Sequence, residues 1–123
     1  MSKESKRQQR FAGLIQQDLA EIFLREGGRW LPDGMITVTQ VRMTPDLGIA
    51  RVFLSFFNAK DPNQAILAIK NRSGEIRYKL GNKIKNQAKN IPQLEFFIDD
   101  SHDYKEHMDK LFDEISKEKR QDE

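Results

Sequence analysis

The chain has 123 residues, a length that fits one folded domain, and its 37% hydrophobic and 33% charged residues predict a thin core under a charged surface. It contains no cysteine, which excludes disulfides, thiolate nucleophiles and thiolate metal sites. No apolar stretch is long enough to cross a bilayer, and the basic N-terminus leads into an amphipathic segment, so we expect a cytoplasmic protein without a signal peptide.

The first predicted element is an amphipathic helix over residues 5–26. Its apolar residues recur at spacings of three and four: Phe11, Leu14, Ile15, Leu19, Ile22 and Phe23. We expect Gly27 and Gly28 to end the helix, because glycine is common just after a helix C-terminus. The same glycines could belong to a phosphate loop, but no Gly-Lys-Ser/Thr follows them.

Two strands are predicted next, over residues 35–43 and 49–57. The first is rich in β-branched residues, and its alternation breaks at Gln40-Val41, which indicates a bulge. The second alternates well along its whole length. The sequence TPDLG between them is typical of a turn, in which Gly48 is available for positive φ. We therefore expect an antiparallel hairpin.

Two further helices are expected to meet at Gly74. The first begins at Asp61-Pro62, an N-cap followed by proline at the first helical position. Its core-facing stripe is Ala65, Ile66, Leu67, Ala68 and Ile69. The apolar pattern reaches Arg72-Ser73-Gly74 and resumes with Ile76, Leu80, Ile84 and Ala88. An interior glycine costs about 1 kcal/mol relative to alanine, so Gly74 predicts a kink or a close backbone approach.

A third strand and a last helix complete the predicted order. Leu94, Phe96 and Ile98 alternate with Glu95, Phe97 and Asp99, which predicts the strand, and an amphipathic helix is expected over residues 101–119. The tail 117–123 has no apolar anchor and is expected to fray. The order α-β-β-α-kink-α-β-α predicts a single α+β domain, ordered over residues 5–116, with a three-stranded sheet and helices packed on one face.

The residues offer little material for catalysis or metal binding. His102 and His107 are five apart, which does not place them on one helical face as a zinc pair four apart would be. Residues 99–110 begin like a calcium loop but lack its glycine and its final glutamate. Neither Ser55 nor Ser73 has a histidine nearby in the sequence that would activate it. Activation by a histidine distant in the sequence stays an alternative. We expect no enzyme, no metal site and no cofactor.

Charge is distributed unevenly along the chain, although the net charge is only +2. Residues 70–89 hold seven bases and one acid, the first ten residues hold four bases and one acid, and residues 95–123 hold eleven acids and five bases. Charge runs are usually solvated helix faces, so the position of the run must decide its meaning.

The basic run surrounds the expected kink. A kink exposes backbone N–H groups near a helix start, where the helix dipole favours anions, and glycine lets a phosphate backbone approach closely. This arrangement favours binding of a nucleic-acid backbone. The candidate RNA-binding residues are Lys70, Arg72, Ser73, Gly74, Arg77, Lys79, Lys83, Lys85 and Lys89. Tyr78 could stack on a base, and it could equally border the core.

Four segments, taken in order, resemble the ribosome-binding factor A family of bacterial small-subunit assembly factors. They are RFAGLIQQDLAEIF, ITVTQVRMTPDLGIARVFLSF, SGEIRYKLG and PQLEFFIDDS, and the resemblance runs from Arg7 to Phe112. It implies a type II KH-like domain in which a helix-kink-helix with an Ala-x-Gly signature replaces the usual GxxG loop. Arg72, Ser73 and Gly74 stand at the matching positions, with arginine in place of the family's alanine.

The resemblance implies an RNA-binding maturation factor. Such a protein would bind immature small ribosomal subunits and their rRNA, assist late maturation and processing of that rRNA, and leave before translation. It would matter most in the cold. We expect a monomer that does not bind membranes. The alternative is a protein-interaction adaptor that binds an acidic partner protein through the same basic face, since charge composition does not distinguish two polyanions.

Overall fold

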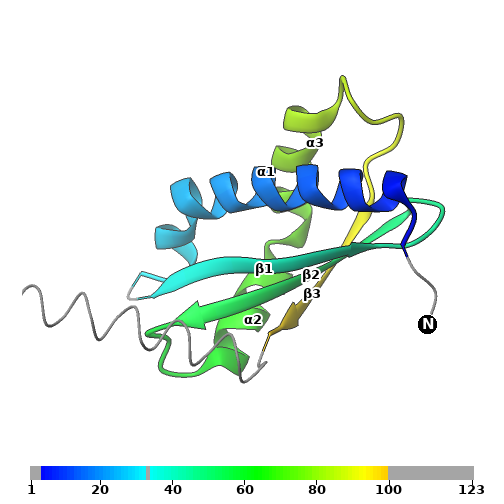
Figure 1. Cartoon of the computed structure of the whole chain (residues 1–123). Helices are drawn as coiled ribbons and strands as arrows, with labels where there is room; N and C mark the ends of the chain where they lie inside the picture. The colour runs from blue at the N-terminus through cyan, green and yellow to red at the C-terminus, as the bar shows by residue number, and fades with distance from the viewer. Residues whose placement is uncertain (1–3, 33, 100–123) are drawn as a thin grey trace, which may run out of the picture.

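The computed structural model describes residues 4–32 and 34–99, which form three helices and three strands. The elements follow in the order α1 (Lys6–Trp30), β1 (Met35–Met43), β2 (Ile49–Phe57), α2 (Pro62–Asn71), α3 (Ser73–Ile84) and β3 (Gln93–Ile98). In Figure 1, α1 lies across the sheet, α3 stands behind α1, and α2 lies behind the strands. The predicted α+β fold is confirmed, while the expected helix 101–119 and the tail lie outside the described residues.

Helix α1 is longer than predicted, because it continues through Gly27 and Gly28 to Trp30. Trp30 is buried, and its ring meets that of Phe23 edge to face, with centroids 5.9 Å apart. Burial of a large aromatic ring stabilises the last turn by more than the roughly 1 kcal/mol that each glycine costs in a helix. The prediction that the two glycines end the helix is therefore wrong, and α1 ends at Trp30, with Leu31 as the C-cap residue whose N–H donates to the carbonyl of Gly27.

Strands β1 and β2 form the predicted antiparallel hairpin. Their register shifts between Val38 and Gln40, which confirms a bulge in this strand but places it at Thr39, one residue before the predicted Gln40-Val41. In the turn, the residue with positive φ is Leu47, at 59°, and not Gly48 as expected. The side chain of Leu47 packs against the core, and this burial holds the residue in a conformation that leucine rarely adopts.

Strand β3 completes the sheet by pairing with β2 in parallel, so the strand order is β1-β2-β3. The core lies between the sheet and the helices and receives buried side chains from every helix and every strand. Ile15, Leu19, Leu54, Ile69, Ile76, Leu80 and Ile84 are among its largest fully buried members. Because one cluster joins all three helices to the sheet, the helices cover a single face, as predicted.

The break between α2 and α3 falls at Arg72, whose φ is −101° and ψ is 9°. Gly74, which was predicted to form the kink, lies inside the first turn of α3 with no positive φ. A Cβ atom added at Gly74 would meet nothing within 4 Å, so the fold itself does not require glycine there. Helix α2 begins as predicted, because the Asp61 carboxylate accepts a hydrogen bond from the N–H of Asn63.

Two other sequence expectations for these helices are wrong. Leu67 is 50% exposed and does not belong to the buried stripe of α2. The apolar spacing predicts a helix that reaches Ala88, but α3 ends at Ile84. Ala88 nevertheless packs against the core from the following connection, which explains why it fits the apolar spacing. Among the described residues, none of the helices is both long and apolar enough to span a membrane.

Candidate nucleic-acid interface

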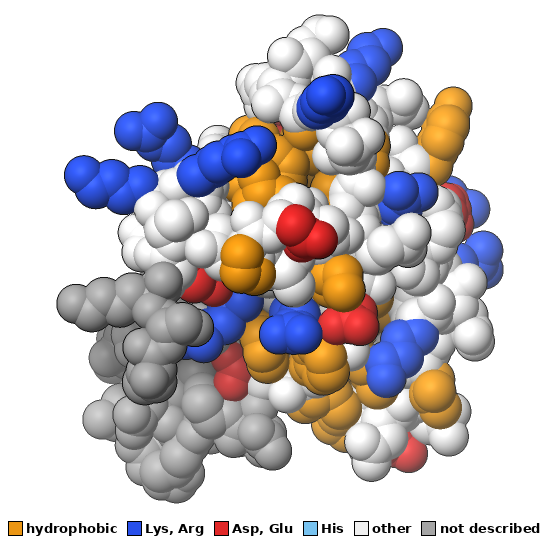
Figure 2. All heavy atoms as spheres, turned by 90° about the vertical axis from the view of Figure 1, so that its right-hand side faces the viewer, with side chains coloured by type: hydrophobic (Ala, Val, Ile, Leu, Met, Phe, Trp, Pro, Cys, Tyr) orange, Lys and Arg blue, Asp and Glu red, His pale blue; other side chains and the backbone are white. Residues whose placement is uncertain are grey.

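The predicted RNA-binding residues do not form one continuous patch. They lie at the break between α2 and α3, along the seam between α3 and α1, and in the connection 85–92. Figure 2 shows one end of the molecule, where Lys and Arg side chains lie at several places on the surface with apolar and acidic side chains between them. The role of each base therefore depends on what it contacts.

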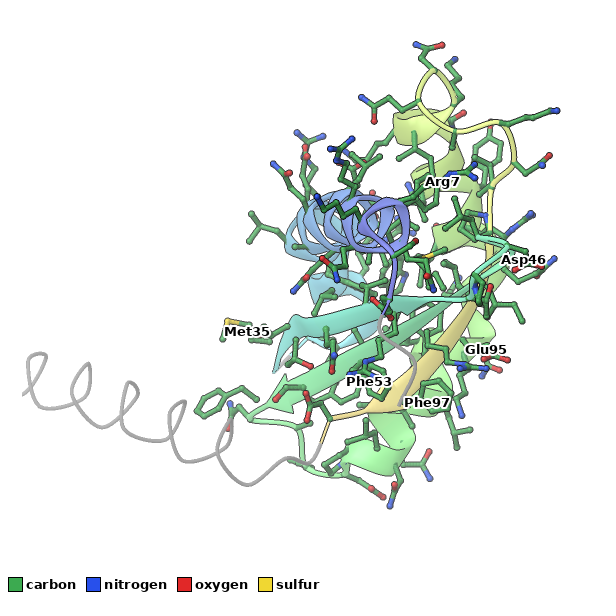
Figure 3. The ribbon with its side chains drawn as sticks, turned by 45° about the vertical axis from the view of Figure 1, so that its right-hand side comes forward. Arg7, Met35, Asp46, Phe53, Glu95 and Phe97 are labelled. Carbon is green, nitrogen blue, oxygen red and sulfur yellow. The ribbon has the colours of Figure 1, made fainter. Side chains whose placement is uncertain are left out.

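Among the kink residues Arg72, Ser73 and Gly74, Ser73 lies beside β3. Lys70 and Ser73 line a hollow of about 360 Å³ there, together with Leu94, Glu95, Phe96 and Phe97. On the sheet face away from the helices, Phe97 stacks on Phe53 with ring centroids 5.4 Å apart (Figure 3). The kink thus presents a lysine, a hydroxyl and an exposed glycine beside a polar and aromatic strand edge.

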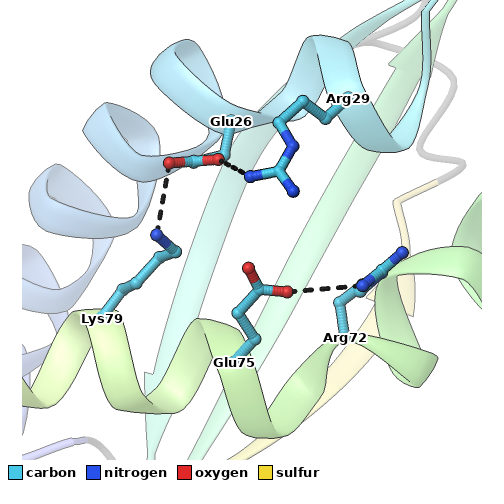
Figure 4. A network of polar contacts seen from close by, with 5 residues as sticks. All are labelled: Glu26, Arg29, Arg72, Glu75 and Lys79. Carbon is cyan, nitrogen blue, oxygen red and sulfur yellow. Dashed lines mark hydrogen bonds and ion pairs between the residues drawn. The ribbon is translucent and has the colours of Figure 1, made fainter.

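Arg72 forms an exposed ion pair with Glu75, in which Nη1 lies 3.6 Å from Oε2 (Figure 4). Such an exposed pair is worth about 0–1 kcal/mol, so it leaves Arg72 available to a phosphate. The side chain of Arg72 makes no hydrogen bond to the first turn of α3. Arg72 therefore places an exposed positive charge at the break between α2 and α3.

Lys79 and Lys83 join α3 to α1 through two glutamates. Lys79 Nζ lies 3.2 Å from Glu26 Oε1, and Lys83 Nζ lies 2.9 Å from Glu21 Oε2. Figure 4 shows the first of these pairs, in which Glu26 also accepts a hydrogen bond from Arg29. The lysine side chains are only 33% and 28% exposed. Within the folded chain, both positive charges are thus already paired.

These ion pairs make the stability of the protein depend on pH in the acid range. The hydrogen bond from Lys83 holds the pKa of Glu21 below its ordinary value of 4.5, and the hydrogen bond from Lys79 does the same for the pKa of Glu26. A carboxyl whose pKa is lowered by folding contributes stability above its unfolded pKa and loses it as pH falls through the folded pKa. The contribution of the seam should therefore begin to fall below about pH 4.5 and be lost as pH drops through the lowered pKa values of the two carboxyls.

We expect the double variant Lys79→Met/Lys83→Met to be less stable than the wild type at neutral pH, because Glu21 and Glu26 each lose the lysine partner that joins α3 to α1 and keep only an arginine of α1. The difference between the two proteins should shrink as pH falls below about 4.5, since the carboxyls become protonated. Urea unfolding followed by circular dichroism at a series of pH values measures this difference in the free energy of unfolding. A difference that stays constant into acid would show that the lysines stabilise by packing alone.

Arg77 fixes the connection that leads into β3. Its Nε donates to the carbonyl of Pro92 at 3.0 Å, and its Nη2 donates to the carbonyl of Ile91 at 2.8 Å. Lys85 and Lys89 lie in the same connection and are exposed. Tyr78, for which two roles were open, is 72% exposed and does not border the core.

Sequence reasoning missed three bases at the start of α1. Lys6, Arg7 and Arg10 line a second hollow, together with apolar side chains and with Gln87 of the connection 85–92. The excess of bases in the first ten residues was a signal, but it did not show that these side chains lie beside residues 47 and 87. That neighbourhood follows only from how α1 crosses the sheet.

Comparison with known proteins identifies the family. Residues 7–112 match the family model described as ribosome-binding factor A. The chain belongs to the ribosome-binding factor A family. It is 40% identical over 120 residues to ribosome-binding factor A of Cytophaga hutchinsonii, covering 98% of this chain and 90% of that protein. It is 37% identical over 109 residues to that of Flavobacterium psychrophilum, covering 86% and 82%. The resemblance predicted from four sequence segments is confirmed.

Solved structures of ribosome-binding factor A share the fold. The crystal structure of the Thermus thermophilus protein aligns with a TM-score of 0.63 at 19% identity, covering 74% of this chain and 94% of that one. A homology model of the Thermus thermophilus factor, fitted into a cryo-EM map of a 30S complex, aligns with a TM-score of 0.58 at 21% identity, covering 70% and 88%. The expected KH-like architecture is thus the architecture of the family.

Proposed function

We propose that this chain is a ribosome assembly factor that binds immature small subunits, assists late maturation and processing of small-subunit rRNA, and leaves before translation. Membership of the ribosome-binding factor A family over residues 7–112 carries this proposal. The Thermus thermophilus factor, which has the same fold, has been fitted into a map of a 30S complex, and this supports the small subunit as the partner. The protein would act in the cytoplasm as a monomer without a cofactor or a catalytic step, most importantly in the cold.

The proposed RNA-binding site is centred on the kink. Gly74 would let a phosphate approach the first turn of α3, where the helix dipole favours negative charge. The bases of the predicted set that are exposed would contact neighbouring phosphates: Lys70, Arg72, Lys85 and Lys89. The other bases, Arg77, Lys79 and Lys83, act as positioning residues because their charged groups are bonded within the fold. Ser73 offers its hydroxyl beside Lys70.

Sedimentation of the tagged protein in cell extract tests the partner. The protein should migrate with free small subunits at low salt, be absent from translating ribosomes, and lose the association after nuclease treatment. If about four bases neutralise phosphates, the logarithm of the association constant should fall with the logarithm of salt concentration at a slope near −3. Association that survives nuclease would favour an adaptor that binds an acidic protein, and a flat salt response would contradict binding through phosphates.

We expect Gly74→Val to weaken binding to small-subunit rRNA by about tenfold, the effect of losing one charge-assisted hydrogen bond of about 1.5 kcal/mol. A Cβ atom added at Gly74 meets nothing within 4 Å outside its own helical turn, so we expect the variant to fold. Gly28→Val is the matched control, because Gly28 is also exposed in a helix with open space around it. Fluorescence anisotropy measures the binding and far-UV circular dichroism the fold. Equal affinities for the two folded variants would remove Gly74 from the site.

A further inference from the structure

A hollow of about 480 Å³, the basic hollow, lies at the N-terminal end of α1. It is lined by three cationic side chains, by apolar walls that include Phe11 and Leu47, and by the exposed residue Gln87. The three cations are Lys6, Arg7 and Arg10. Figure 2 looks onto this end of the molecule, and Figure 3 marks Arg7 and Asp46 on it.

The basic hollow carries positive charge that nothing in its lining compensates. None of the described residues that line it is acidic. The acid of the adjacent turn, Asp46, is not part of the lining, and its carboxylate accepts hydrogen bonds from the hydroxyl of Thr44 and the N–H of Gly48. In this respect the hollow differs from the α1–α3 seam, where each lysine faces a glutamate.

The walls of the basic hollow are fixed in place. Ser5 and Gln8 form a capping box at the start of α1, and the buried amide of Gln8 also donates to the carbonyl of Met43 at 2.9 Å. The first turn of α1 is therefore tied to the end of β1. On the other side, Leu47 keeps its positive φ of 59° while its side chain packs against the core. The cations thus project from a rigid support, which reduces the entropy lost on binding.

We propose that the basic hollow is a second RNA contact that holds one nucleotide of a single strand. The cations would bind its phosphate, and its base would lie against Phe11 and Leu47, within reach of the Gln87 amide. Cations around an apolar floor suit a nucleotide better than an acidic peptide, because every nucleotide presents an aromatic face beside its negative charge, whereas acidic side chains carry no such face. This inference rests on the proposed function and adds a contact that the kink does not provide.

The two contacts lie at opposite ends of α3. Gly74 is in the first turn of the helix, and Gln87 follows its last turn, so the twelve residues of α3 separate the contacts by about 18 Å. Between them, Lys79 and Lys83 are paired with α1 glutamates. The RNA would therefore be held at two points, with a neutralised stretch of protein between them.

The test compares two double variants of α1 with the same loss of charge. Arg7→Gln/Arg10→Gln removes cations of the basic hollow, whereas Arg25→Gln/Arg29→Gln removes arginines near the other end of the helix, where each pairs with a glutamate of its own helix. The probe is a fluorescein-labelled single-stranded oligouridine. We expect the first variant to bind about tenfold more weakly and to lower the salt slope by about 1.4, and the control to match the wild type.

A second variant separates recognition of a base from attraction to charge. Phe11→Leu keeps an apolar wall but removes the aromatic ring. It should weaken binding of oligouridine and leave binding of inorganic polyphosphate unchanged, because polyphosphate has no base to stack. Equal losses in the two double variants, or no effect of Phe11→Leu, would overturn the inference. If polyaspartate displaces the probe as well as RNA does, an acidic protein is the partner and the inference also fails.

The outcomes distinguish this inference from the proposed function. A wild-type protein that binds neither the oligouridine nor small-subunit rRNA would refute both. A wild type that binds RNA, together with an Arg7→Gln/Arg10→Gln variant that binds as well as its control, would refute the basic hollow alone. Circular dichroism of every variant confirms that the comparison is made between folded proteins.

Discussion

Leu80→Ala is expected to lower the free energy of unfolding by about 2–5 kcal/mol, the usual range for truncating a buried leucine. Leu80 is fully buried in the middle of α3, on the face that packs into the core with Ile76 and Ile84. The substitution removes apolar contacts and leaves a cavity between the helices and the sheet. Because α3 also carries Gly74 at its start, loosening this face would disturb the proposed RNA site as well as the fold.

Urea unfolding followed by circular dichroism measures this cost. Tyr78→Ala is the control on the same helix, because Tyr78 is 72% exposed and its truncation should change stability by no more than about 0.5 kcal/mol. If Leu80→Ala proved as stable as Tyr78→Ala, the packing of α3 on the sheet would be wrong.

Arg77→Met is expected to cost about 1.5–3 kcal/mol, the typical contribution of hydrogen bonds from a charged donor. The guanidinium donates to two consecutive carbonyls, those of Ile91 and Pro92, just before β3 begins. Methionine retains most of the apolar stem but leaves both carbonyls without this donor. The connection into β3 should then loosen.

Thermal and urea unfolding of Arg77→Met measure the loss against Arg25→Met, which removes an arginine whose side chain is 72% exposed and has one helical ion pair. The control should lose about 0.3–0.5 kcal/mol. RNA affinity measured on the same samples decides the role of Arg77. A variant that keeps wild-type stability but binds RNA weakly would make Arg77 a direct phosphate contact.

Most of the fold could be predicted because its signals are local. The bulge in β1 appears in the sequence as a break in two-residue alternation, and the start of α2 appears as Asp61-Pro62. The end of α1 could not be predicted from Gly27 and Gly28, because the residue that extends the helix, Trp30, gains its stability from burial. Positive φ at Leu47 has the same origin, since the core holds a side chain that local preferences would not place there.

The candidate site was only partly predictable because the partner of each base lies far away in the sequence. Lys79 meets a glutamate 53 residues earlier, and Arg77 reaches carbonyls 14 and 15 residues later. A run of basic residues shows none of these pairings. The basic hollow could not be predicted for the same reason, because its cations come from the first turns of α1 and its wall includes Gln87, which is distant in the sequence.

The two edges of β2 also gain their partner strands at different times. Its pairing with β1 requires only a short turn, whereas its pairing with β3 joins residues such as Arg51 and Glu95, which are 44 positions apart. Long-range contacts of this kind form slowly, because a long loop must close first. During synthesis, β2 therefore keeps an unpaired edge until both α2 and α3 have emerged. Variants that slow the docking of β3 should reveal themselves as aggregation of newly made chains before any loss of equilibrium stability is measurable.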